Sequence, residues 1–285
     1  MALFNFEKKE KEPEYFASSL NTPLINYRVY YMSGAEKVTS FLLAFVVGAV
    51  AGWVFYGDLF MVDGERTINT YISNAVICTI VGIVAGIIFI YIRRDSLRED
   101  RQNKLRTQFR EYLSSLNSSF AAGDNVMTAF RRAKADIISE YGEDAYIVSE
   151  AIELSDGLDN NVAIDELLNS LAYRSDIDDI KSFCEVFLVC NQKGGDMKSV
   201  VRNTYDLIGE KIAIAEEIET KLTSNKMQQN VMSVVPIFVI AFLRVSSSTF
   251  AASFATPMGI LTMTIAIGIF IGAYFYGRKV ISVVG

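Results

Sequence analysis

Four apolar segments, arranged as two pairs around a long polar block, constrain this chain more than any other feature of its sequence. The first pair spans residues 38–56 and 75–92, and the second spans residues 231–250 and 257–276. An α-helix needs about 20 apolar residues to cross a hydrocarbon core about 30 Å thick. The segment lengths therefore predict four transmembrane helices in two hairpins.

The polar block between the pairs spans residues 93–226 and is long enough to build a hydrophobic core of its own. Its apolar residues recur at the three- and four-residue spacing of α-helices, and no strand-like alternation competes with that spacing. The block is therefore predicted to be a bundle of about six helices. The predicted core stripes are Leu105, Phe109, Leu113, Leu116 and Phe120; Val126, Phe130, Ala133 and Ile137; Ile147, Ala151 and Leu154; Ile164, Leu167, Leu168 and Leu171; Ile177, Ile180, Cys184, Phe187 and Cys190; and Val200, Tyr205, Ile208, Ile212, Ile218 and Leu222.

The expected fold class is thus all-α, with four transmembrane helices in two hairpins that flank a cytoplasmic helical bundle. Its parts are an N-terminal segment at 1–37, a hairpin at 38–92, the bundle at 93–226, a second hairpin at 227–277 and a tail at 278–285. The last bundle helix is expected to be long and to lead toward the third apolar segment.

Positive charge predicts which side of the membrane each part occupies. Lysine and arginine cluster before the first apolar segment, after the fourth, and most densely at residues 93–110. In the connections 57–71 and 245–256 together, the only lysine or arginine is Arg66. Because positive flanks stay in the cytoplasm, we expect both termini and the block to be cytoplasmic in a multi-pass membrane protein.

The basic run at residues 93–110 is expected to meet membrane lipid headgroups and not nucleic acid, because the rest of the block is acidic and repels phosphate. No short apolar region with a cleavage site precedes residue 38, so the first apolar segment is expected to stay in the protein.

The composition argues against an enzyme. The chain contains no histidine, which removes histidine-based triads, histidine-ligated zinc and most general-base schemes at neutral pH. No glycine-rich nucleotide loop and no EF-hand loop occurs. The three cysteines, Cys78, Cys184 and Cys190, are expected to be small core residues. We therefore expect no catalytic residue, no cofactor and no metal site.

Glycines mark two expected turns within the bundle. Gly123 fits the end of the first bundle helix, and Asp124 or Asn125 fits the start of the next. Gly194 and Gly195 interrupt the chain before the last helix, and Asp196 is suited to cap that helix. No lysine of a phosphate-binding loop and no preceding strand accompanies this pair, so we interpret it as a structural turn.

Small residues and one charge stand out in the apolar segments. Glycines four apart share a helix face and let another backbone approach closely, which predicts tight helix packing. These glycines are Gly48 and Gly52, Gly82 and Gly86, and Gly268 and Gly272. Arg244 lies well inside the third segment, after Pro236; it is expected either to extend toward the outer interface or to contact a substrate or another subunit.

Acidic residues dominate the middle of the bundle. Thirteen Asp or Glu lie between residues 140 and 185, against only Arg174 and Lys181. Two interpretations stay open: a solvated face that keeps the domain soluble, or a docking surface for a basic partner. The candidate docking residues are Asp156, Asp159, Asp165, Asp176 and Asp178.

Two stretches resemble a known family. Residues 109–123, Phe-Arg-Glu-Tyr-Leu-Ser-Ser-Leu-Asn-Ser-Ser-Phe-Ala-Ala-Gly, followed by Val-Met-Thr-Ala-Phe at 126–130, resemble the opening of the F domain of type II secretion and type IV pilus systems. Residues 190–204, with Lys-Gly-Gly-Asp-Met inside them, resemble that family's Gly-Gly turn and following helix. One F domain between two helix pairs resembles the tight-adherence (Tad) branch.

This resemblance implies a role without a reaction. Such proteins are inner-membrane platforms that couple a cytoplasmic hexameric ATPase to the extraction of pilin subunits and to pilus assembly. They act as homo-oligomers or with a paralogous platform subunit. The alternative is a membrane sensor or a transporter-associated helical module; short outer loops disfavour a sensor, and a single charge in the apolar segments disfavours a transporter.

Overall fold

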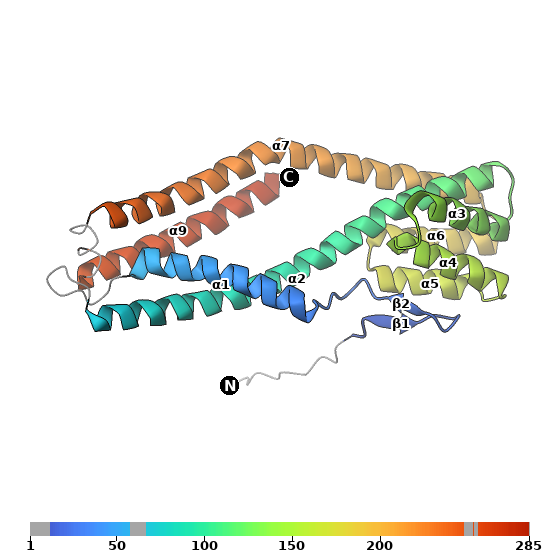
Figure 1. Cartoon of the computed structure of the whole chain (residues 1–285). Coiled ribbons are helices and arrows are strands. Elements are labelled where there is room, and N and C mark those ends of the chain that lie inside the picture. Colours follow the sequence, from blue (N-terminus) through green and yellow to red (C-terminus); the bar gives the residue numbers. More distant parts are fainter. Residues whose placement is uncertain (1–11, 58–66, 248–252, 254–255, 285) are drawn as a thin grey trace, which may run out of the picture. The chain divides into compact units, whose positions relative to one another are not determined.

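The computed structural model describes residues 12–57, 67–247, 253 and 256–284, and α-helices make up most of that part of the chain (Figure 1). The prediction of an all-α fold class is confirmed, with one small strand pair added. The elements are β1 (Tyr15–Ala17), β2 (Pro23–Ile25), α1 (Gly34–Tyr56), α2 (Ile68–Ala121), α3 (Val126–Tyr141), α4 (Tyr146–Asp159), α5 (Ile164–Ser175), α6 (Asp178–Lys193), α7 (Met197–Ser246) and α9 (Pro257–Val284).

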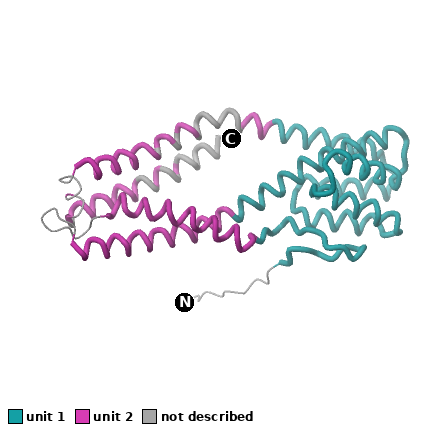
Figure 2. Tube along the Cα trace, viewed as in Figure 1, with its two compact units in different colours: residues 1–31, 94–213 teal, residues 32–93, 214–285 magenta. Residues whose placement is uncertain are grey.

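The chain divides into two compact units (Figure 2). The first, here called the bundle unit, contains residues 94–213 together with the N-terminal residues up to Tyr31. The second, here called the apolar unit, contains residues 32–93 and 214–285. Helices α2 and α7 are continuous across these boundaries, so each belongs partly to both units.

The core of the bundle unit consists of the apolar faces that the helical spacing predicted. Aromatic rings meet at its centre: Phe109 lies edge-on to Phe183 at 5.4 Å between centroids, and Phe130 lies edge-on to Phe187 at 5.8 Å. Such pairs add about 0.5–1.5 kcal/mol beyond the area they bury. The side chain of Leu222 lies outside the described residues. Eight predicted core residues are only partly buried: Phe120, Val126, Ile164, Cys190, Val200, Tyr205, Ile212 and Ile218.

The N-terminal residues carry structure that the sequence did not indicate. Strands β1 and β2 pair antiparallel, with Phe16 opposite Leu24. The Ser18 hydroxyl accepts the backbone N–H groups of Leu20 and Thr22, and Asn21 has a φ of 60° in the connecting turn. Three-residue strands are too short to show a clear alternation. We call residues 12–31 the N-terminal strap.

The apolar unit opens with a well-defined helix start. Ser33 accepts the backbone N–H of Glu36, and the Glu36 carboxylate accepts the backbone N–H of Ser33, a complete capping box at the start of α1. Helices α1 and α2 are long and apolar enough to cross a membrane, which makes the chain compatible with a membrane protein.

Two helices therefore meet the membrane criterion where the sequence predicted four. Within the residues that the structure describes, the apolar stretches of the second pair are shorter, at Val234–Ser246 in α7 and Met258–Ile269 in α9. The third predicted segment ends in residues 248–250, which lie outside the described part, as does most of the connection 57–71.

Candidate functional site

Both long helices are held in the bundle unit by one buried carboxylate. Asp179 lies in the first turn of α6 and is only 4% exposed. Its Oδ2 lies 3.2 Å from Nε of Arg106 on α2, and its Oδ1 accepts Nζ of Lys211 on α7. The N-terminal end of a helix also favours a negative charge. Asp179 is therefore a joint between α2, α6 and α7.

A second contact joins α2 directly to α7. The guanidinium of Arg110 lies 4.5 Å from the centroid of the Tyr205 ring, and Nη2 donates to the Tyr205 hydroxyl at 3.1 Å. One turn along α7 from Tyr205, a Cβ at Gly209 would lie 3.0 Å from Nε of Arg110. A side chain at residue 209 would thus crowd the arginine, and glycine leaves it room.

The turn before α7 fixes where that helix begins. Gly194 has a φ of 73°, in the left-handed region that glycine enters without a Cβ clash, and Gly195 N–H donates to the Cys190 carbonyl at 2.8 Å. Asp196 accepts the backbone N–H of Ser199 at 3.2 Å. Hydrogen bonds from the Ser199 hydroxyl and N–H hold the pKa of Asp196 below its usual range. The predicted turn residues lie together here.

The earlier turn is built in the same way. Gly123 has a φ of 87°, and the next helix starts at Asn125, whose side chain accepts the N–H of Thr128 at 2.9 Å. Of the two candidates left open by the sequence, Asn125 is the N-cap of α3. Asp124 instead pairs with Arg132 at 2.8 Å.

The N-terminal strap is bound to α4 and α5 through a buried ion pair that sequence reasoning missed. Arg174 and Glu150 are 2% and 1% exposed, and two parallel hydrogen bonds of 2.7 and 2.5 Å join them. Tyr27 of the strap donates its hydroxyl to Glu150 at 3.1 Å, and burial beside this carboxylate raises the pKa of Tyr27. Arg174 also donates to the carbonyl of Ile25. The only sequence feature that pointed to this ion pair was the scarcity of basic residues near Arg174.

The five candidate docking aspartates do not form one uncompensated acidic surface. Asp156 and Asp159, on α4, pair with Lys134 and Arg131 of α3, both at 2.6 Å. Hydrogen bonding to Arg131 lowers the pKa of Asp159. These two aspartates therefore pair with basic residues of the neighbouring helix.

The other three candidates lie elsewhere on the bundle unit. Asp176 and Asp178 flank the start of α6 and share Lys181, at 3.1 and 3.9 Å. Asp165 lies in the first turn of α5 and accepts the side chain of Gln192 at 3.1 Å. The observed partners favour the solvated, locally paired interpretation of the acidic stretch.

The glycines of the apolar unit behave in two ways. Those of the first pair are packing contacts between α1 and α2: a Cβ at Gly48 would lie 2.7 Å from Cβ of Ala85, and one at Gly86 would lie 2.5 Å from the ring of Phe41. Gly52 and Gly82 are similarly crowded. By contrast, a Cβ at Gly268 or Gly272 of α9 would meet no other element among the described residues within 4 Å.

Arg244, in the last turn of α7, contacts the end of α1 within the apolar unit. Its side chain is 5% exposed, and its guanidinium binds backbone carbonyls at the end of α1 within the same unit. Extension to the outer interface and contact with a substrate or another subunit both stay predictions. The contacts that it makes here are intramolecular.

Within the residues that the structure describes, no group of three His, Cys, Asp or Glu side chains is placed to hold a metal ion. Burial raises the pKa of the Cys184 thiol to about 12, so this cysteine stays protonated and unreactive at neutral pH. Comparisons with protein-family models, with curated proteins and with solved structures find no match to this chain.

Proposed function

We propose that this chain is a non-enzymatic platform of the inner membrane that carries movement from a cytoplasmic motor into membrane helices. The main support for this proposal is the position of Asp179. It binds α2 and α7 at one point, and these two helices continue from the bundle unit into the apolar unit. A force that displaces α6 would act on both long helices at once.

The partners follow from the resemblance at residues 109–130 and 190–204 to the F-domain family. The motor would be a hexameric secretion ATPase, and the cargo would be pilin subunits drawn from the membrane. The platform would work as a homo-oligomer or with a paralogous subunit. All four apolar segments would cross the membrane as two hairpins, with both termini and the bundle unit in the cytoplasm, as the basic flanks favour.

The test compares Asp179→Asn with a matched control in the native host. Asparagine keeps the shape of the side chain but removes the charge that binds Arg106 and Lys211. We expect surface pili to be lost while the protein still inserts. Asp206→Asn is the control, because Asp206 lies on α7 with a 57% exposed side chain and pairs with Arg202 of the same helix, at 3.8 Å.

A second measurement separates loss of coupling from loss of the partner. Co-purification of the ATPase with the Asp179→Asn protein should be retained, because the exposed surface of the bundle unit is unchanged. Normal piliation by this variant would remove the basis of the proposal. Failure of the wild-type chain to co-purify with any hexameric ATPase would point to the sensor or transporter alternative.

A further inference from the structure

An arginine closes the end of α1. Arg244 donates Nη1 to the carbonyl of Trp53 at 3.0 Å and to the carbonyl of Val54, and Nη2 to the carbonyl of Gly57. All three acceptors belong to the last turn of α1 or to its C-cap. Arg244 itself lies in the last turn of α7, so the bond joins the first apolar pair to the second.

The chemistry of a helix end explains the fit. The last four carbonyls of an α-helix have no partner within the helix, and the end carries partial negative charge. A guanidinium presents several N–H groups in one plane and stays charged, so a single arginine satisfies several carbonyls. Water is scarce in an apolar environment, and an unsatisfied backbone carbonyl there is costly. A buried guanidinium and unpaired helix-end carbonyls each cost free energy when alone, and here they satisfy one another.

A second polar contact lies beside the first. The Tyr56 hydroxyl of α1 and the Thr264 hydroxyl of α9 are 3.1 Å apart. The end of α1 is therefore held by both helices of the second pair, through side chains that bond to defined atoms.

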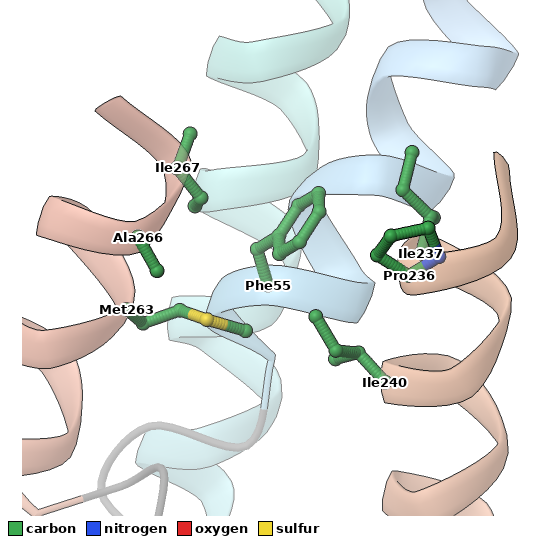
Figure 3. A pocket seen from close by; sticks show the side chains of 7 residues that line it. All are labelled: Phe55, Pro236, Ile237, Ile240, Met263, Ala266 and Ile267. Carbon is green, nitrogen blue, oxygen red and sulfur yellow. The ribbon is translucent and has the colours of Figure 1, made fainter. Parts of the chain in front are cut away.

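The apolar contact at the same place is incomplete. A cavity of about 330 Å³ lies between Phe55 of α1, the Pro236–Ile240 stretch of α7 and the Met263–Ile267 stretch of α9 (Figure 3). Every residue that lines it is apolar, so no hydrogen bond fixes Phe55 against the opposite walls. A void forfeits the contacts that close packing would make.

We infer that Arg244 is a positioning residue that pins the end of α1 to the second helix pair, and that the cavity beside it lets α1 pivot about this pin. The polar bonds fix one point, and the unfilled space leaves the neighbouring side chains free to shift. The inference does not rest on the proposed function, because its readouts are distances and cross-linking rates within this chain.

Cross-linking tests the pin. Cysteines at Tyr56 and Thr264 report on the contact between α1 and α9. The full chain in native membranes is treated with a short bifunctional maleimide, which spans the reach of the lost tyrosine side chain, and the linked peptides are followed by mass spectrometry. We expect Arg244→Gln to slow this cross-link about tenfold, the effect of about 1.4 kcal/mol lost from the closed arrangement. Arg244→Lys should restore part of the rate, since it keeps the charge. Arg93→Gln, an exposed arginine in the same unit, is the matched control and should have no effect.

Filling the cavity tests the pivot without disturbing the pin. Spin labels carried by noncanonical amino acids at Val50 and Ile269, both exposed, report the spread of distances between α1 and α9. Ala266→Leu should narrow that spread, and Arg244→Gln should widen it. An unchanged cross-linking rate in Arg244→Gln overturns the pin, and an unchanged spread in Ala266→Leu overturns the pivot.

Discussion

Replacing Arg174 by methionine should strongly destabilise the bundle unit. Methionine fills a similar volume but leaves the Glu150 carboxylate, 1% exposed, without its cation. Breaking a buried pair in this way costs about 3–5 kcal/mol. The bonds from Arg174 to the carbonyl of Ile25 and to the hydroxyl of Ser170 are lost as well.

This cost converts into a large change in melting temperature. A unit of roughly 150 residues loses about 3 °C per kcal/mol, so the expected decrease in melting temperature is about 9–15 °C. Calorimetry of the full chain in detergent gives the transition. Hydrogen exchange then identifies the part of the chain that unfolds in this transition. The backbone amides of the strap, α4 and α5 should lose protection first.

Two companion variants test whether the loss of stability comes from the unpaired buried carboxylate. Arg131→Met removes the same kind of side chain from an exposed pair with Asp159 and should leave the melting temperature nearly unchanged. Arg174→Met combined with Glu150→Gln should be less destabilising than the sum of the single changes, because no unpaired charge is then buried. A fall of under about 2 °C in Arg174→Met, or strict additivity in the double variant, would refute the account.

Three further outcomes are expected. Tyr112→Phe should raise the stability of the bundle unit by about 1 kcal/mol in chemical denaturation, because the buried Tyr112 hydroxyl has no hydrogen-bond partner among the described residues. Burial raises the pKa of Tyr112, so the folded state keeps a proton that the unfolded chain releases near pH 10; wild-type stability should fall above about pH 10, and Tyr112→Phe should reduce that fall. Gly86→Leu should cost about 1–3 kcal/mol of stability through collision with Phe41, whereas Gly272→Leu should be tolerated, as thermal melts in detergent would show. In intact cells, a membrane-impermeant thiol reagent should label a cysteine at Ser253 and not one at Asp159; labelling at Asp159 would reverse the assigned topology.

The helices themselves follow from local sequence. Phe109, Phe130 and Phe187 were predicted from a spacing that matches 3.6 residues per turn, and all three are buried. A residue on the apolar face of an amphipathic helix packs toward the core, whichever helix lies opposite. The same holds for Gly194, whose backbone conformation depends on a turn between two adjacent helices. These features depend on residues that are close together in the chain, so the apolar stripes and the turns could be predicted from the sequence.

The partners of the charges were decided only by the tertiary structure. Asp179 lies 32 residues from Lys211, and Arg244 lies 191 residues from Trp53. Helical spacing places Glu150 on the buried face of α4 and Asp156 outside that face, but it does not identify Arg174 or Lys134 as their partners. An ion pair depends on which helix faces are brought together and on how much water they exclude. The sequence by itself therefore determined where the helices form and which faces they bury, while the packing of distant helices decided which charges became joints.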